Sequence, residues 1–120
     1  MENPTELQKL SIQIKNFCED RDWNQFHTPK DLAIGISTEA AELLELFRFK
    51  SDEEVSGLFN EPAFRVKVEQ ELADIFFFLL RFAERSNVDL LAACDSKMKL
   101  NAEKYSIEKS KGSNKKYSEL

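Results

Sequence analysis

The sequence predicts an all-α protein, and three observations carry this prediction. The chain has 120 residues, of which only three are Gly and three are Pro, so turns are few and the elements between them are long. Hydrophobic residues make up 42% of the chain and charged residues 32%, which suits a fold with an apolar core. Apolar side chains also recur at helical spacing through four long segments. We therefore expect a four-helix domain over residues 1–108 and a basic, flexible tail over residues 109–120.

The first two helices are predicted from periodicity and from residues that favour helix starts. Residues 5–20 carry apolar side chains at helical spacing, and Thr5 follows a proline at their beginning. Residues 21–28, RDWNQFHT, form an aromatic-rich connection. A second helix is expected over residues 29–49, because Thr28 is a suitable N-cap and the next residue is a proline.

Two further long helices follow a short acidic segment. The segment SDEEVSGLF is expected to form one or two turns. A third helix is predicted over residues 62–85, and a fourth over residues 89–105 after a break near Asn87. The helices over 29–49 and 62–85 are apolar around most of their circumference and must be buried on most sides. A chain of this length scarcely encloses two such helices alone, so we expect a homo-oligomer.

The charge and the cysteines exclude several classes of protein. The formal net charge is −5, so the chain is a poor general binder of nucleic-acid polymers, although residues 104–116 are locally basic. No segment approaches the length of a membrane span, and the N-terminal MENPTELQKL is too polar for a signal peptide. Cys18 and Cys94 form no CxxC pair and are expected to be reduced thiols in a cytoplasmic protein.

Two acidic pairs lie inside the apolar helices. Glu39 and Glu42 are three residues apart in the second helix, and Glu71 and Asp74 are three residues apart in the third. Residues at this spacing share a helix face, so two antiparallel helices can bring all four carboxylates together. Such carboxylates repel unless a cation lies among them, and Mg²⁺ prefers oxygen ligands. The pattern therefore indicates a Mg²⁺ site, whereas zinc is disfavoured by a single His and no clustered Cys.

Other interpretations of the acidic pairs are open. The chain has 22 acidic residues, so pairs at this spacing arise by chance on solvated surfaces, as Glu42 with Glu45 illustrates. A non-catalytic helical scaffold that binds a partner through its apolar faces is one alternative. A di-iron bundle is another, but it requires Glu-x-x-His pairs, which this sequence lacks. The narrow polar stripe favours the metal site, because solvated helix faces are broad.

Three motifs in order resemble a known family. The pattern EAAE at 39–42 and ELAD at 71–74 is similar to that of the MazG-like all-α nucleoside triphosphate pyrophosphatases. RDWNQFH at 21–27 and KMKLNAEKY at 97–105 resemble the dCTP pyrophosphatase branch of that family. The resemblance implies a Mg²⁺-dependent cut between the α and β phosphates of a nucleotide. It also implies four-helix subunits assembled as a dimer of dimers.

The resemblance assigns roles to individual residues. By motif match, Glu39, Glu42, Glu71 and Asp74 are the metal-binding and catalytic carboxylates. Seven further positions match substrate-binding residues of the family: Trp23, His27, Phe49, Lys97, Asn101, Lys104 and Tyr105. Phe49 departs from the pattern, because a Trp is expected in its segment. Apart from the resemblance, Trp23 is equally well explained as a core or interface aromatic, whereas His27 is better explained as a capping or surface residue. Without the resemblance, Lys97 and Lys104 are also better explained as exposed cations near a helix C-terminus.

Overall fold

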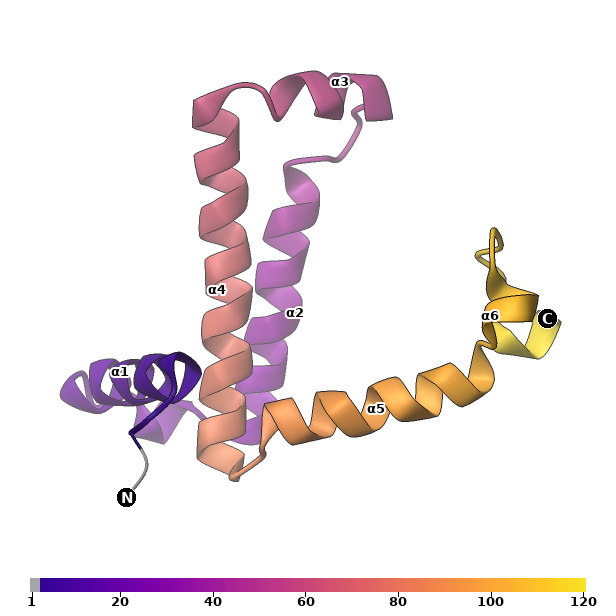
Figure 1. Cartoon of the computed structure of the whole chain (residues 1–120). Helices are drawn as coiled ribbons and strands as arrows, with labels where there is room; N and C mark the ends of the chain where they lie inside the picture. Colours follow the sequence, from indigo (N-terminus) through magenta and orange to yellow (C-terminus); the bar gives the residue numbers. More distant parts are fainter. Residues whose placement is uncertain (1–2) are drawn as a thin grey trace. The chain divides into compact units, whose positions relative to one another are not determined.

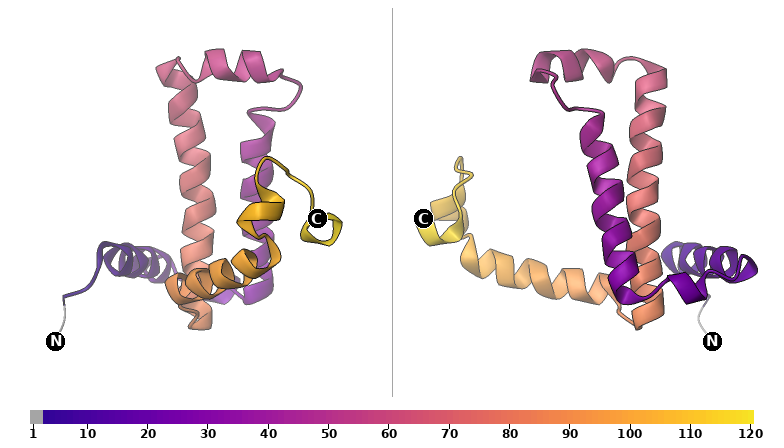
Figure 2. Two further views of the ribbon diagram at one scale, coloured as in Figure 1. Left: turned by 45° about the vertical axis from the view of Figure 1, so that its right-hand side comes forward. Right: turned by 180° about the vertical axis from the view of Figure 1, so that it is seen from behind.

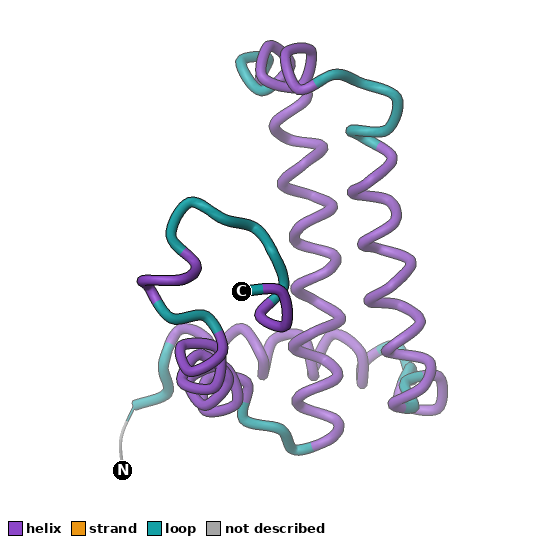
Figure 3. The backbone as a smooth tube through the Cα atoms, turned by 90° about the vertical axis from the view of Figure 1, so that its right-hand side faces the viewer, coloured by secondary structure: helices purple, strands orange, loops and turns teal. Residues whose placement is uncertain are grey.

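A computed structural model describes residues 3–120 of the chain. Within this range all regular secondary structure is helical, with six α-helices, two short 3-10 helices and no strand, and loops connect the helices (Figure 3). The all-α class is therefore confirmed, but the predicted number of four helices is wrong. The two additional helices, α3 (Asp52–Leu58) and α6 (Ile107–Ser110), are short and begin at the serine N-caps Ser51 and Ser106. None of the described helices has the length and apolarity needed to cross a membrane.

The chain forms two compact units, the first of which ends at Asn87. Its elements are α1 (Glu6–Asp20), η1 (Asn24–Phe26), α2 (Pro29–Glu45), α3 and α4 (Pro62–Ser86). Helices α2 and α4 run antiparallel, side by side, and α3 connects them at one end (Figures 1 and 2). Helix α1 packs against α4 near the other end of this pair.

The helix starts follow local capping chemistry. Thr5 and Gln8 form a capping box at the start of α1, so each side chain accepts a hydrogen bond from the other's backbone N–H. The Thr28 hydroxyl accepts a hydrogen bond from the Asp31 N–H at 3.2 Å at the start of α2. The end of α2 is less regular, because the helix stops at Glu45 and tighter turns continue to residue 49.

The core of this unit is small for two helices so apolar. Its buried apolar side chains come mainly from α1 and α4: Ile14, Cys18, Leu32, Phe64, Val68, Leu80 and Ala83. Phe47, Phe59 and Phe64 pack as an aromatic cluster where α2, α3 and α4 meet, with ring centroids 5.4–6.1 Å apart. Large apolar side chains elsewhere on α2 and α4 remain exposed, so this unit alone does not bury them.

Gly35 of α2 allows the close approach of α4. A Cβ atom at Gly35 would lie 2.6 Å from two ring atoms of Phe78, closer than carbon atoms pack. Glu39 follows Gly35 by one helical turn, and Asp74 precedes Phe78 by one turn. The contact between Gly35 and Phe78 therefore sets the spacing of the two helices beside both acidic pairs.

The second unit runs from Val88 to Leu120 and contains α5 (Leu90–Lys104), α6 and η2 (Tyr117–Glu119). The Asp89 carboxylate caps α5 by accepting a hydrogen bond from the Ala92 N–H at 3.0 Å. Near the C-terminus, Tyr117 packs edge-on against Tyr105, and the Lys104 ammonium lies 4.8 Å from the Tyr117 ring centroid. The domain limit at residue 108 and the mobility of residues 109–120 stay predictions.

Replacing Gly35 with Ala tests the helix contact. The added methyl group meets the Phe78 ring, which costs about 1–3 kcal/mol of overpacking, whereas the higher helix propensity of Ala returns about 1 kcal/mol. Gly57→Ala is the control, because Gly57 is helical and nothing lies within 4 Å of an added Cβ. We expect the free energy of unfolding, measured by urea denaturation, to be about 1–3 kcal/mol higher for the Gly57→Ala variant than for the Gly35→Ala variant. Equal values would show that Phe78 moves aside without cost.

Candidate functional site

Four carboxylates from α2 and α4 meet in the first unit. Glu39 and Glu42 project from α2, and Glu71 and Asp74 project from α4. One carboxylate oxygen of each residue lies within 4.8 Å of the corresponding oxygens of the other three. The i, i+3 spacing within each pair and the antiparallel arrangement of the helices together produce this convergence. We call these residues the acidic cluster.

The acidic cluster is partly removed from water and has no basic partner among the described residues. Glu39 and Glu71 are half-buried, whereas Glu42 and Asp74 are exposed. The Oε2 atoms of Glu39 and Glu71 are buried and accept no hydrogen bond. Among residues 3–120, no lysine or arginine forms an ion pair with any of the four carboxylates. Buried anionic oxygens without a partner are costly, so this arrangement favours a bound cation.

The electrostatics of the acidic cluster point the same way. Burial raises the pKa of Glu39 to about 7, and the nearby Glu42, Asp74 and Glu71 carboxylates add to the shift. Burial likewise raises the pKa of Glu71, and Glu42 and Asp74 raise it further. A divalent cation among these oxygens would remove the repulsion that opposes ionisation. The set contains only hard oxygen donors and has an exposed side where water can complete the coordination, so it fits Mg²⁺ or a similar divalent cation.

The connection between α1 and α2 carries two of the predicted substrate-binding residues. Trp23 and His27 are both half-buried, and their ring centroids lie 6.0 Å apart. Trp23 also packs edge-on against Phe17 of α1 at 5.6 Å. The two rings therefore stand together at one end of the first unit, held by the helix that precedes them.

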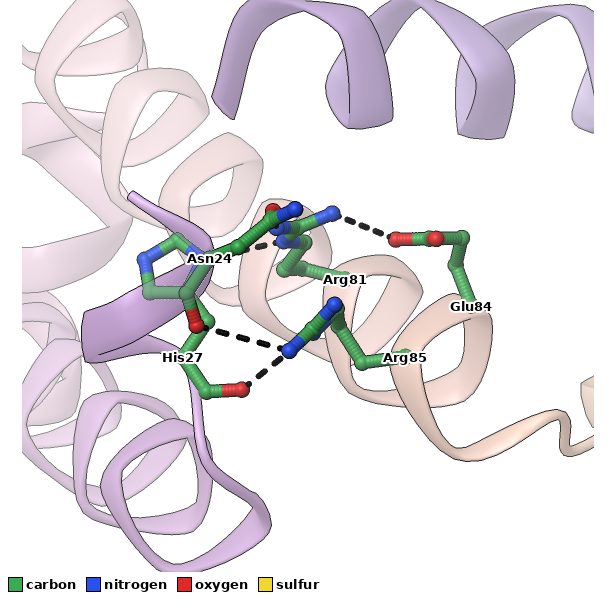
Figure 4. Close-up of polar contacts among 5 residues, drawn as sticks. All are labelled: Asn24, His27, Arg81, Glu84 and Arg85. Carbon is green, nitrogen blue, oxygen red and sulfur yellow. Dashed lines mark hydrogen bonds and ion pairs between the residues drawn. The ribbon is translucent and has the colours of Figure 1, made fainter. Parts of the chain in front are cut away.

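Arg81 of α4 is a buried charged residue beside this connection that the sequence reasoning did not single out. Its side chain is fully buried and donates hydrogen bonds to Asn24 and His27 of this connection, and to Glu84 of its own helix (Figure 4). The available signal was one arginine inside an apolar run of α4, where an unpaired charge would be too costly to keep.

Phe49 lies apart from this connection, between α2 and α3. Its side chain is 90% exposed, and its backbone has a φ of 63°, in the left-handed region that aromatic residues rarely adopt. The guanidinium of Arg48 lies 4.5 Å from the centroid of its ring. Phe49 is thus presented to solvent on a strained turn, as residues at ligand sites frequently are.

The remaining predicted residues belong to the second unit. Lys97, Asn101 and Lys104 lie on α5, where Lys97 and Lys104 are exposed and Asn101 is half-buried. Tyr105 is the C-cap of α5, and its backbone N–H donates to the Asn101 carbonyl at 2.8 Å. The spacing of 97, 101, 104 and 105 places them at successive turns of the same helix end.

Comparisons with known proteins identify related chains. A sequence model of the MazG-like family matches residues 34–120. Over 104 residues, or 87% of this chain, the sequence is 40% identical to dCTP pyrophosphatase 1 of Rattus norvegicus and 38% identical to dCTP pyrophosphatase 1 of Homo sapiens. The chain spans 61% of the length of each of these two relatives.

A solved structure is also similar over most of the chain. It is the crystal structure of a pyrophosphatase from Archaeoglobus fulgidus DSM 4304, with a TM-score of 0.78 and 34% sequence identity. The similarity covers 88% of this chain and 97% of the other. This chain is therefore similar to that pyrophosphatase in both fold and sequence.

The acidic cluster predicts how stability depends on pH and on divalent metal. In metal-free protein the pKa of Glu39 is about 7, whereas its ordinary value is 4.5, so between these pH values the folded protein keeps a proton that the unfolded chain releases. The contribution of Glu39 to stability is therefore fully present below its ordinary pKa and is lost as the pH rises through its pKa in the folded protein. We expect the Tm in EDTA to fall from pH 5 to pH 8, and Mg²⁺ to raise the Tm more at pH 8 than at pH 5.

Two variants identify the source of this pH dependence. Glu39→Gln removes the titrating group and should flatten the fall in Tm. Glu45→Gln is the matched control, because Glu45 lies on the same helix and pairs with Arg48 outside the cluster. If both variants follow the wild-type profile, Glu39 does not titrate as its burial requires.

Proposed function

The chain belongs to the MazG-like family, and from this premise we propose that it is a Mg²⁺-dependent nucleoside triphosphate pyrophosphohydrolase. It cleaves a deoxynucleotide such as dCTP between the α and β phosphates, releasing the monophosphate and pyrophosphate. The main support is the acidic cluster, whose four carboxylate oxygens lie within 4.8 Å of one another. The similarity to proteins named dCTP pyrophosphatase 1 supports the choice of substrate. The proposed role is to cleanse a cytoplasmic nucleotide pool.

We assign two roles to the carboxylates, namely binding the metal ion and accepting a proton. Glu39, Glu42, Glu71 and Asp74 would bind Mg²⁺, and the buried, unpartnered Oε2 atoms of Glu39 and Glu71 would be available to it as ligands. When bound, Mg²⁺ neutralises phosphate charge, polarises the scissile phosphoryl group and lowers the pKa of a water molecule. A carboxylate oxygen of the cluster that is not used in coordination accepts the proton of the attacking water.

The other candidate residues bind the two ends of the nucleotide. Trp23 stacks on the base, a contact worth about 1–3 kcal/mol in single-strand nucleic-acid sites, and Phe49 offers a second exposed ring. His27 contacts the base edge. Further groups bind the sugar and the outer phosphates: Lys97, Asn101, Lys104 and Tyr105. Ammonium groups and an amide are suited to these acceptors.

We further propose that the protein is a homotetramer, a dimer of dimers. Leu72 and Phe76 of α4 are 49% and 43% exposed, and they line an apolar groove with Ala73, Ile75 and Leu79. Ile34 and Leu44 of α2 are exposed as well. Apolar surface of this extent is covered in stable proteins, and a second copy of the same helices is a suitable cover.

A nucleotide panel tests the proposed activity. Purified protein is incubated with each common nucleoside and deoxynucleoside triphosphate, in Mg²⁺ or in EDTA, and the products are separated by ion-exchange chromatography. We expect dCTP to yield dCMP and pyrophosphate in Mg²⁺ and to remain intact in EDTA. A folded tetramer that leaves every nucleotide intact would favour the non-catalytic scaffold.

Substitution of Glu71 separates a catalytic role from a structural one. Glu71→Gln is nearly isosteric and should reduce kcat more than 100-fold while leaving helicity and assembly unchanged, since it removes a metal-binding charge. Glu69→Gln makes the same change two residues away, outside the acidic cluster, and should retain activity. Unfolding of Glu71→Gln, seen by circular dichroism, would instead mean that the carboxylate stabilises the fold.

Trp23→Ala tests base stacking. Loss of the indole removes binding that is equal in the ground state and the transition state, so KM should rise roughly tenfold or more while kcat changes little. Steady-state kinetics with dCTP and Mg²⁺ measure both constants. An unchanged KM in a correctly folded variant would remove Trp23 from the base-binding site.

A further inference from the structure

Arg81 is the most deeply buried charged residue in the described chain. Its side chain is 0% exposed, within the apolar run of α4. The guanidinium uses all three nitrogens: Nε donates to His27 Nδ1 at 2.9 Å, Nη1 to Glu84 Oε2 at 2.6 Å, and Nη2 to Asn24 Oδ1 at 2.5 Å (Figure 4). Glu84 compensates the buried charge, whereas Asn24 and His27 belong to the connection between α1 and α2.

The bond to His27 determines where the imidazole carries its proton. Nδ1 accepts a hydrogen bond only when it is unprotonated, so a neutral ring must hold its proton on Nε2. A guanidinium at this distance also opposes the imidazolium form. Burial lowers the pKa of His27, and Arg81 and Arg85 lower it further, while Asp31 and Glu84 act weakly in the opposite direction. His27 is therefore mainly neutral at pH 7, with its proton on Nε2.

We propose that Arg81 is a positioning residue that holds His27 as a fixed Nε2–H donor for an acceptor atom on the edge of the nucleobase. The inference rests on the proposed function and deepens it. The acceptor is assigned to the base because His27 stands 6.0 Å from Trp23, the ring expected to stack on it. A fixed donor favours bases with a carbonyl oxygen or unprotonated ring nitrogen at that position, and it rejects bases with an amino group there.

The same geometry excludes a different role for His27. A histidine that moves protons in catalysis must alternate between its neutral and charged forms near neutral pH. Here Arg81 occupies Nδ1, and Nε2 already carries the proton. His27 thus contributes to substrate selection, and the proton transfer remains with the acidic cluster.

Arginine is required at this position because one residue must bind three partners. A planar guanidinium donates in three fixed directions, whereas a lysine ammonium is a point charge that cannot hold this fork. Arg85 supports the connection differently, since its hydrogen bonds within the described chain go to the backbone carbonyls of His27 and Asn24, at 3.5 and 3.4 Å. Arg85 therefore serves as a matched control that touches the same segment but not the imidazole.

Nitrogen NMR measures the tautomer directly, because the chain contains a single histidine. Full-length ¹⁵N-labelled protein, prepared without a polyhistidine tag, gives one imidazole in long-range ¹H–¹⁵N spectra. We expect wild-type protein and Arg85→Met to show an unprotonated Nδ1 and a protonated Nε2. Arg81→Met should show a mixture of tautomers and a His27 pKa closer to its ordinary value. Wild-type protein with its proton on Nδ1, or an unchanged spectrum in folded Arg81→Met, would overturn the proposal.

Kinetics connect the tautomer to substrate binding. Arg81→Met should raise KM for dCTP roughly two- to tenfold, the effect of one neutral hydrogen bond, with a smaller change in kcat, while Arg85→Met changes both less. If Arg81→Met fails to fold, the double variant Arg81→Met with Glu84→Gln, which removes both charges, takes its place. A tautomer change without any change in KM would overturn the role in substrate binding. Wild-type protein that cleaves no nucleotide would refute the proposed function and leave the NMR result intact.

Discussion

The close approach of α2 and α4 is the constraint on which the rest of the structure depends. Gly35 has no side chain, so the Phe78 ring lies where a Cβ atom would otherwise be. Glu39 and Asp74 each lie one turn from this contact, on the same faces of their helices. Larger separation at Gly35 would move the two acidic pairs apart, because a helix transmits a displacement of its axis to the neighbouring turns. A packing contact thus determines the geometry of a polar site.

Apolar packing in the rest of the first unit offsets the electrostatic cost of the acidic cluster. Half-buried carboxylates without basic partners oppose ionisation and weaken folding near neutral pH. A small fold tolerates this cost when apolar packing on both sides of the cluster holds the helices together. The Phe47, Phe59 and Phe64 cluster lies at one end of the helix pair, and Phe17, Trp23, Phe77 and Phe78 form a chain of edge-on contacts elsewhere. A divalent cation would turn the same repulsion into binding energy.

Helix α4 also carries a buried positive charge, whose surroundings differ from those of its two carboxylates in the acidic cluster. Within residues 3–120, Asp74 and Glu71 lie without basic partners, whereas Arg81, two turns further along α4, is fully buried and has a hydrogen-bond partner for each nitrogen. The first arrangement leaves oxygens available for a ligand, and the second rigidifies the segment that carries Trp23 and His27. Helix α4 therefore supports two parts of the candidate site, one with carboxylates that lack a basic partner in the described chain and one with an arginine that has a hydrogen-bond partner for each nitrogen.

The sequence by itself determined what depends on neighbours along the chain. Helix starts at Thr5 and Thr28 follow from capping chemistry, the all-α class follows from helical periodicity and few breakers, and the i, i+3 spacing alone places each acidic pair on one helix face. Only the tertiary structure decided which carboxylates are half-buried, that α2 ends at Glu45, and that Arg81 holds His27. The burial of the carboxylates and the Arg81–His27 contact depend on residues far apart in the chain, 54 positions for Arg81 and His27, and local pattern carries no information about such partners.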